Sequence, residues 1–200
     1  MIEIKSLSFA HGKNLIFTGF DAVIQDKCAT LLTGPNGSGK TTLLQLIGGV
    51  LKPSAGSIEI NGQKVSSLSS KEQAQIRSIA PQRRIFELAF TVEEILAIIK
   101  PNNRAHHADA VIDALDLRQI FTFKITELSL GQQQRVSVAL ALIQHADFYL
   151  LDEPFSAQDS EYTQKLLDLI ALLSKETGVL VISHNTGLIA QYFSERIELA

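Results

Sequence analysis

A glycine-rich run between residues 34 and 41 has the composition of a phosphate-binding loop. It fills every required position of the pattern G-x-x-x-x-G-K-[S/T]. Glycines let successive backbone N–H groups turn inward and form a concave nest for phosphate oxygens. Lys40 would place a positive charge near the β- and γ-phosphates, and Thr41 would offer a hydroxyl to Mg²⁺. The run consists of Gly34, Pro35, Asn36, Gly37, Ser38, Gly39, Lys40 and Thr41, and Thr42 follows it.

The residues on either side of the loop agree with this interpretation. Residues 28–33 form an apolar run of strand length, and residues 42–47 have the composition of a helix. A phosphate would therefore lie at a helix N-terminus, where the helix dipole and the free N–H groups favour an anion. The three segments together predict a nucleoside triphosphate site.

A second run, residues 148–151, is apolar and ends in two carboxylates, Asp152 and Glu153. Ligands of open α/β sheets bind beyond the carboxyl ends of the strands, so both side chains would face the nucleotide. We interpret Asp152 as the carboxylate on the Mg²⁺ side of phosphoryl transfer. Glu153 would hold and polarise the attacking water as the general base. Two acids before a proline are a common surface turn by themselves, but with the phosphate loop they indicate a nucleotide hydrolase.

The elements that position these residues can be predicted from hydrophobic periodicity. Alternating residues at 2–9, 15–24 and 57–62 predict three strands of a small antiparallel sheet near the N-terminus. In the second of these strands we expect one apolar face, made of Ile16, Phe20, Ala22 and Ile24. Apolar runs at 148–152 and 179–183 predict further strands, separated or preceded by helices at 132–145 and 160–176. Alternating strands and helices predict an α/β fold with a mostly parallel sheet flanked by helices.

Two capping boxes mark helix starts in the middle of the chain. Ser69 is followed by Glu72, and Thr91 by Glu94, each at the spacing that lets both side chains bond the partner's backbone N–H. The first helix should run to Arg77, and Pro101 should end the second. A helical stripe at 105–118 follows. Residues 85–126 are therefore expected to be helical throughout, as an inserted subdomain of a single domain spanning residues 1–200.

Composition limits the possible functions. The chain has 200 residues, a net charge of −3 and a single cysteine, Cys28. A slightly acidic balance gives no electrostatic reason to expect nucleic acid as a partner. One cysteine excludes an internal disulfide and suits a reducing, cytoplasmic setting. The apolar runs are shorter than the roughly 18–20 residues that span a bilayer, so another chain would have to supply any membrane part.

The segment between the loop and the two carboxylates discriminates among nucleotide hydrolases. It contains Leu128, Ser129, Leu130, Gly131 and Gln132, and Gln132 lies 20 residues before Asp152. At this point the chain resembles the ATP-binding cassette (ABC) ATPases, whose signature L-S-G-G-Q lies about one helix before the Asp-Glu strand.

Three further segments resemble motifs of the same family and occur in the family's order. Pro81 and Gln82 resemble the Q-loop, residues 156–159 the D-loop, and His184 the switch histidine. Two positions differ from the family pattern, since Leu130 replaces a signature glycine and Gln158 replaces a D-loop leucine. His11 occupies the position of the aromatic residue that stacks on adenine.

The resemblance implies a P-loop ATPase that binds ATP and Mg²⁺ and hydrolyses ATP. Thr41 and Gln82 would hold Mg²⁺ with Asp152 behind them, and His184 would steady the γ-phosphate. Two cassettes would pair head to tail, as a homodimer or with a similar subunit. The signature would then act on the nucleotide of the partner. The resemblance assigns nucleotide contacts across this pair to Ser129, Gly131, Gln132 and Asp159.

The resemblance also implies that the helical insertion docks on an integral membrane permease, which would place the protein on the inner face of the cell membrane. A soluble ABC ATPase without a transport role, such as the iron–sulfur assembly type, remains an alternative. A GTPase or a small-molecule kinase lacks support, because the chain has no Asn-Lys-x-Asp motif. The direction of transport and the cargo stay open.

Overall fold

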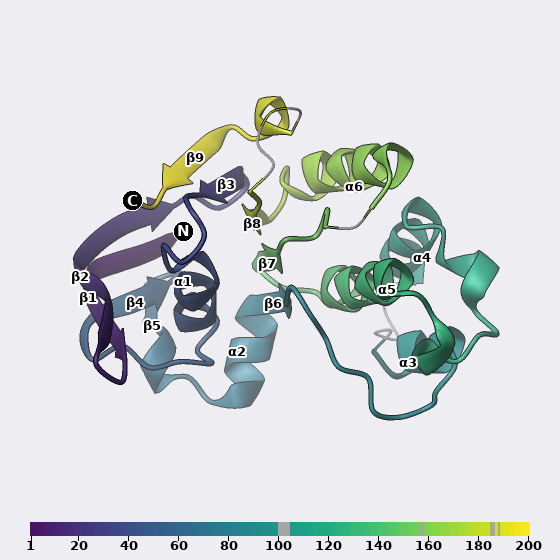
Figure 1. Ribbon diagram of the computed structural model, residues 1–200, viewed down its shortest axis with the longest axis horizontal. Coiled ribbons are helices and arrows are strands. Elements are labelled where there is room, and N and C mark those ends of the chain that lie inside the picture. Colours follow the sequence, from purple (N-terminus) through teal and green to yellow (C-terminus); the bar gives the residue numbers. More distant parts are fainter. Residues whose placement is uncertain (100–104, 157, 185–186, 188) are drawn as a thin grey trace.

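Two β-sheets form the framework of the protein (Figure 1). The computed structural model describes residues 1–99, 105–156, 158–184, 187 and 189–200. The antiparallel sheet has the order β2-β1-β4-β5 and consists of β1 (Ile2–His11), β2 (Asn14–Ile24), β4 (Ala55–Ile60) and β5 (Gln63–Lys64). The second sheet has the order β6-β7-β8-β3-β9 and only parallel pairs among its described strands. Its strands are β3 (Ala29–Thr33), β6 (Arg77–Ala80), β7 (Phe148–Asp152), β8 (Gly178–Ile182) and β9 (Glu195–Glu198).

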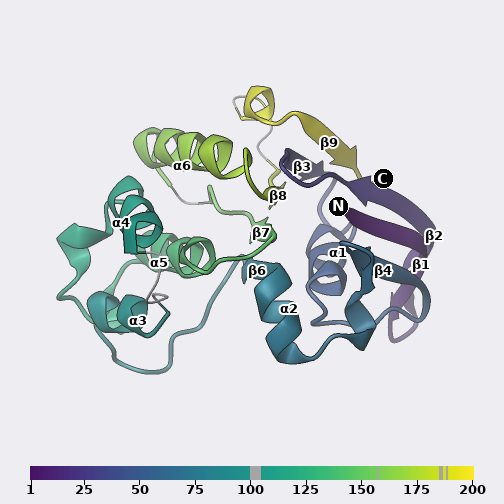
Figure 2. The same cartoon turned by 180° about the vertical axis from the view of Figure 1, so that it is seen from behind.

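Six α-helices of the described chain surround these sheets. They are α1 (Lys40–Ile47), α2 (Ser70–Ile76), α3 (Val92–Ile99), α4 (Ala105–Ala114), α5 (Leu130–Ile143) and α6 (Ser160–Leu173). Helix α1 lies beside the antiparallel sheet, whereas α3, α4 and α5 lie at the opposite end of the molecule in both views (Figures 1 and 2). The predicted α/β class, with a small antiparallel part, is confirmed.

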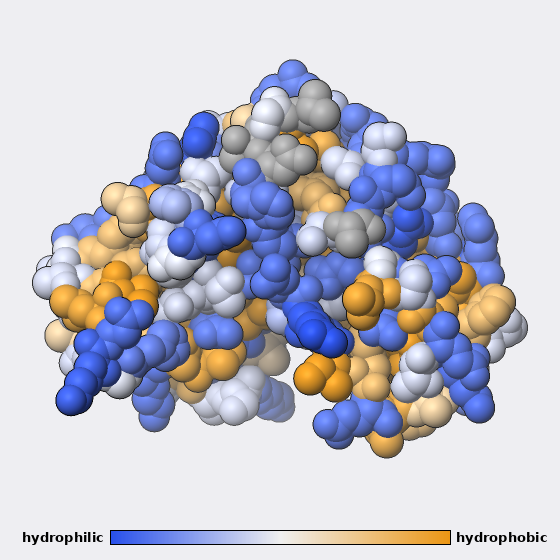
Figure 3. Space-filling view, viewed as in Figure 1, coloured by the Kyte–Doolittle hydropathy of each residue, from blue (hydrophilic) through white to orange (hydrophobic). Residues whose placement is uncertain are grey.

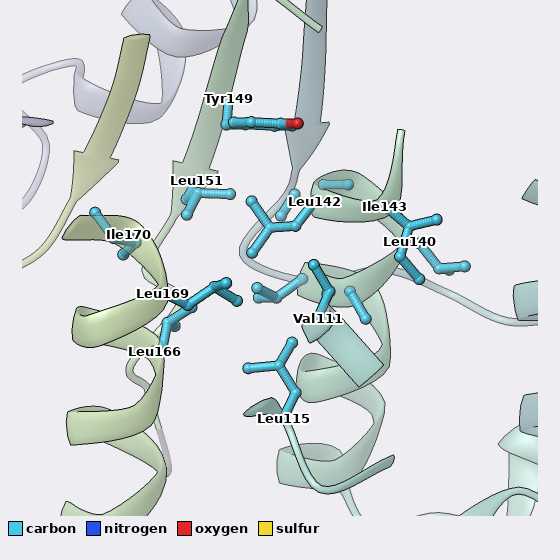
Figure 4. Packing of buried hydrophobic residues seen from close by; sticks show 14 of the residues in the cluster. Val111, Leu115, Leu140, Leu142, Ile143, Tyr149, Leu151, Leu166, Leu169 and Ile170 are labelled. Atoms are coloured by element: carbon cyan, nitrogen blue, oxygen red, sulfur yellow. The ribbon is translucent and has the colours of Figure 1, made fainter. Parts of the chain in front are cut away.

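The parallel strands β3, β7 and β8 are buried along their whole length, because α1 and the antiparallel sheet cover one face of their sheet and helices cover the other. Side chains of β7 alternate between two cores. Phe148 and Leu150 pack with α1 and the antiparallel sheet, while Tyr149 and Leu151 pack with α4, α5 and α6. Figure 4 shows the second core, in which side chains of α5 and α6 converge on those of β7. Because the three strands are parallel and adjacent, their carboxyl ends meet at one edge of the sheet.

Both predicted capping boxes are confirmed. The Ser69 backbone N–H donates to Glu72 Oε2 at 2.8 Å, and the Glu72 N–H donates to Ser69 Oγ at 3.4 Å. Thr91 and Glu94 exchange the corresponding bonds at 2.8 and 3.2 Å. Helix α2 ends one residue earlier than predicted because the next residue, Arg77, begins strand β6.

The expected apolar face of β2 is confirmed in part, since Ile24 is buried and Ile16, Phe20 and Ala22 are partly buried against the same core. Phe17, which was not expected on this face, is buried in that core as well. Leu7 pairs with Phe20 and Phe9 with Phe17, so between these pairs one residue of β1 opposes two residues of β2. This extra residue moves the side chains that follow it to the other face of the strand.

The segment at 85–126 is not helical throughout. An isolated antiparallel bridge joins Thr91 to Lys124, and the Ile125 N–H donates to the Phe90 carbonyl at 2.9 Å. These contacts bring the two ends of the segment together, with α3, α4 and the short 3₁₀ turn Leu117–Ile120 between them. Pro101, the predicted end of the helix at 91, lies outside the described residues, and the limits of the insertion stay a prediction. Of the helices in the described part of the chain, not one has both the length and the apolar character needed to cross a membrane.

Candidate active site

The phosphate loop connects the end of β3 to the first residue of α1. Gly34 has a φ of 148° and Gly39, the N-cap of α1, has a φ of 94°. A Cβ on Gly34 would lie 2.6 Å from the Leu199 carbonyl oxygen, and one on Gly39 would lie 2.6 Å from Cγ2 of Ile16. Both positions therefore need glycine for the backbone angle and for space. The result is a free helix N-terminus at the edge of the parallel sheet.

Lys40 is folded across this loop. Its Nζ donates to the carbonyl oxygens of Gly34 and Pro35, both at 2.8 Å, and the residue is buried. The buried hydroxyl of Ser38 has no hydrogen-bond partner in the described chain. A charged donor, an unpartnered hydroxyl and the helix N-terminus thus lie within one loop of eight residues, which is the composition expected of a phosphate site.

Asp152 lies at the carboxyl end of β7, beside the loop. It is 2% exposed, and its Oδ1 is buried without a hydrogen-bond partner among the described residues. Burial raises the pKa of Asp152, and a hydrogen bond with Thr41 and the charge of Lys40 oppose that rise. A buried carboxylate oxygen with no partner is costly in a protein unless a ligand or an ion completes it.

Glu153 is turned away from the strand that precedes it. Its φ is 51°, and its N–H donates to the Ile182 carbonyl at 3.0 Å, which fixes this turn against the end of β8. Oε2 of Glu153 lies 2.9 Å from Nδ1 of His184. When Glu153 is ionised, Nδ1 must carry the proton and donate it. His184 therefore orients the carboxylate and leaves Oε1 for another partner.

Lys40, Asp152 and Glu153 share one cavity of about 230 Å³, whereas Ser38 and His184 are not part of its described lining. Its described lining brings together Thr41, Gln82 and the adjacent pair Asp152 and Glu153 from three separate segments of the predicted site. The full lining is Ile16, Asn36, Gly37, Gly39, Lys40, Thr41, Thr42, Gln82, Asp152, Glu153 and Ile182. Ile16 and Ile182 were not predicted as site residues, and no pattern in the sequence distinguishes them from core residues.

The donor set of the cavity fits Mg²⁺. It offers a hydroxyl from Thr41, an amide from Gln82 and the unpartnered carboxylate oxygen of Asp152, all oxygen ligands of the kind that Mg²⁺ prefers. The described residues contain no group of three His, Cys, Asp or Glu that could hold a metal ion alone. A Mg²⁺ held here would therefore depend on phosphate oxygens for part of its coordination.

His11 and the signature residues do not line this cavity. The exposed His11 ring meets Phe9 edge-on, with ring centroids 4.8 Å apart. Ser129 is the N-cap of α5, where its Oγ accepts from the Gln132 N–H at 3.2 Å and its own N–H donates to Gln132 Oε1 at 3.0 Å. Helix α5 thus begins at Leu130, two residues before the predicted start, and Leu130 lines a second hollow of about 370 Å³ together with Gln82.

A family model and individual relatives of known name indicate the same family for this chain. The model of the family described as "ABC transporter" matches residues 17–156. The chain is 33% identical to the hemin import ATP-binding protein HmuV of Rhizobium meliloti, over 96% of its own length and 79% of that protein's. It is 31% identical to the zinc transport system ATP-binding protein TroB of Treponema pallidum, over 96% of its length and 75% of the relative's.

The chain belongs to the ABC transporter family. Among solved structures it is similar to a dimeric ATP-binding cassette in a post-hydrolysis state bound to ADP and Pi, with a TM-score of 0.83. The two sequences are 25% identical, and the match covers 100% of this chain and 94% of that one. It spans only 44% of the uncharacterized ABC transporter ATP-binding protein YvrA of Bacillus subtilis, with 33% identity over 91% of its own length. The protein is accordingly an ATP-binding and ATP-hydrolysing subunit that energises transport through a separate membrane component.

Within this ABC chain, Asp159 is engaged by its own neighbours. Its Oδ1 accepts from the Tyr162 N–H at 2.7 Å, which caps α6, and its Oδ2 pairs with Arg135 at 2.9 Å. The hydrogen bond from Tyr162, followed by the charge of Arg135, lowers the pKa of Asp159. The predicted contact of Asp159 with a nucleotide stays a prediction, and Ala157 of the same motif lies outside the described residues. Arg135 and Gln158, which join this segment to α5, were not predicted as site residues.

Proposed function

We propose that two such cassettes enclose Mg²⁺ and ATP between the phosphate cavity of one chain and the signature of the other. A second copy of this chain or a similar subunit would serve as the partner. One observation carries the proposal: the loop, Gln82 and both carboxylates line one cavity, whereas Ser129 and Gly131 of the same chain are absent from its described lining. A single chain therefore offers half of each of two sites. The dimeric cassettes among the similar structures support this pairing.

In this arrangement the residues of the chain have separate tasks. The loop N–H groups and Lys40 would bind the phosphates. Thr41, Gln82 and Asp152 would hold Mg²⁺, which supplies neutralisation of the phosphate charge. Glu153 would orient the attacking water and take its proton on Oε1, since His184 already occupies Oε2. Catalysis would consist mainly of positioning and charge stabilisation.

We further propose that the cassette powers uptake of a small cargo through an integral membrane permease, as a peripheral subunit on the cytoplasmic face. Relatives of which the chain covers 75–80% are named for petrobactin, hemin and zinc import or transport, which favours transport over a soluble role. The segment from 85 to 98 supports the contact with a permease. Its surface side chains Ile85, Leu88 and Ile98 are at least 65% exposed, and hydrophobic patches are visible on the lobe that carries α3 (Figure 3). Exposed apolar groups of this kind mark interaction surfaces.

The pairing is tested by removing two serines that have the same local role. Ser129→Ala and Ser69→Ala each delete the side chain of a capping box, so each should cost about 1 kcal/mol of stability. Ser129→Ala should in addition lower ATP hydrolysis at least tenfold, because a direct contact with the γ-phosphate is worth about that much. Ser69→Ala should leave hydrolysis unchanged.

The rate of hydrolysis per chain should also rise with chain concentration for the native protein and reach a plateau, since each site needs two chains. Equal rates for the two serine variants, or a rate per chain that is independent of concentration, would contradict the shared site. Co-purification with a polytopic membrane protein would test the role in transport. Recovery of the protein from its source with soluble partners alone would contradict that role.

A further inference from the structure

Gln158 uses both ends of its side-chain amide to bind helix α5. Its Nε2 donates to the backbone carbonyl of Gly131 at 2.9 Å, and its Oε1 accepts from Nε of Arg135, also at 2.9 Å. Gly131 and Arg135 are four residues apart, so one amide spans the first full turn of the helix. A leucine, the residue usual at position 158 in the family pattern, could make neither bond.

Arg135 extends this contact to α6. Its terminal nitrogen pairs with Asp159 Oδ2 at 2.9 Å, and its guanidinium lies over the Tyr162 ring at 4.6 Å from the centroid. The planar guanidinium fork can satisfy several partners at once. The Arg135 side chain is 22% exposed, so its bonds are partly shielded from solvent. The first turns of α5 and α6 are thus joined through a continuous set of polar contacts.

This set connects two parts of the proposed machinery. Gly131 belongs to the signature, and Gln158 follows the catalytic Glu153 by five residues. We propose that Gln158 is a positioning residue that holds the signature turn of α5 in place for the ATP bound to the partner chain. The proposal rests on the proposed function, because it assigns the effect of Gln158 to a site that the partner chain carries. Gln158 itself would touch no phosphate and would act through the Gly131 backbone.

Mixed pairs can locate the effect. An active chain at low concentration is combined with an excess of a helper chain that carries Glu153→Gln and is held above the concentration that saturates the rate. In each mixed pair the hydrolysing site belongs to the active chain and uses the signature of the helper. Adding Gln158→Leu to the helper should lower phosphate release per active chain roughly fivefold to tenfold, the effect of about one lost hydrogen bond. The same substitution in the active chain should change the rate less than about twofold.

Two further variants control for folding. Gln144 lies at the other end of α5, where its Nε2 donates to the Leu140 carbonyl at 3.2 Å, so Gln144→Leu in the helper should lower stability without lowering the rate. Gln158→Glu keeps an acceptor for Arg135 but cannot donate to Gly131 when it is ionised. It should therefore reproduce the loss caused by Gln158→Leu, even if the leucine variant fails to fold.

Ser129→Ala separates the inference from the function on which it rests. If Ser129→Ala lowers the rate only from within the active chain, the shared site itself is wrong. If Ser129→Ala acts from the helper but Gln158→Leu acts equally from both chains, or from neither, the positioning role of Gln158 alone is refuted. If both Ser129→Ala and Gln158→Leu lower the rate when the helper carries them, and ATP binding to the single chain is unchanged, the result supports the shared site and the positioning role of Gln158.

Discussion

Glu153→Gln is the sharpest test of the catalytic assignment, because the structure allows this change to be nearly silent for the fold. Glu153 is buried, its backbone is fixed by the bond to Ile182, and its side chain is bonded to His184. Glutamine has the same shape and keeps an acceptor oxygen for Nδ1 of His184. The substitution therefore removes the ability to accept a proton from water and little else.

The expected size of the effect follows from this single loss. A positioned general base contributes roughly 10²–10⁴-fold to rate, which corresponds to roughly 3–5 kcal/mol of activation free energy. ATP binding should persist, since the proposed site assigns the phosphate contacts to Lys40 and the loop rather than to Glu153. With hydrolysis blocked and binding intact, the ATP-bound pair of chains should accumulate.

The assay is phosphate release at saturating Mg²⁺ and ATP, together with light scattering after gel filtration with and without ATP. Glu161→Gln is the matched control, because Glu161 forms an exposed ion pair with Lys165 at 2.7 Å that contributes little to stability. Its rate should equal that of the native chain. If Glu153→Gln hydrolyses ATP within about threefold of the native rate, Glu153 is not the base and the reasoning from its geometry fails.

Four other substitutions test the rest of the site. Lys40→Ala should weaken ATP binding roughly tenfold to a hundredfold while changing AMP binding little, because the proposed site places the lost charge beside the β- and γ-phosphates. Equal losses in titrations with ATP and AMP would contradict this placement. Asp152→Asn should raise the Tm of the nucleotide-free chain by roughly 2–4 °C, as expected for about 1 kcal/mol from removal of a buried charge. It should also abolish the further rise in Tm that Mg²⁺ with ATP causes in the native chain. A Tm below that of the native chain in calorimetry would refute the argument. Gly37→Ala should lower the free energy of unfolding by about 1–2 kcal/mol, the cost of backbone strain alone. Gly39→Ala should lower it more, since its Cβ would also meet Ile16 and Phe17. Urea unfolding that ranks the two variants in the opposite order would show that the loop geometry is wrong.

The parts of the site that lie close together in the sequence could be predicted from it. The phosphate loop and the adjacent carboxylates Asp152 and Glu153 are each contiguous, so residue type and spacing suffice. The capping boxes at Ser69 and Thr91 are equally local. His184 was assigned only through the family resemblance, and its bond to Glu153 requires the pairing of Asp152 with Ile182 between β7 and β8.

Features that depend on distant partners could not be predicted in this way. Strands β6 and β9 have four residues each, too few for a periodic signal, and they exist because β7 and β3 supply hydrogen bonds to them. The burial of Phe17 depends on an extra residue of β2 opposite β1, which no local pattern marks. The hydrogen bonds of Gln158 connect the start of α6 to α5. The sequence showed only that Gln158 replaces the leucine of the family pattern, which does not indicate where its side chain lies.

The capping box at the start of α5 also explains why leucine is compatible with the signature at position 130. The first four N–H groups of a helix end lack helical partners. Ser129 and Gln132 satisfy two of these through each other's side chains, which leaves the N–H groups of Leu130 and Gly131 for an anion. Both are backbone groups, so the side chain at position 130 does not change the donor. That side chain is 70% exposed and Leu130 is already helical, so the position needs none of glycine's conformational freedom.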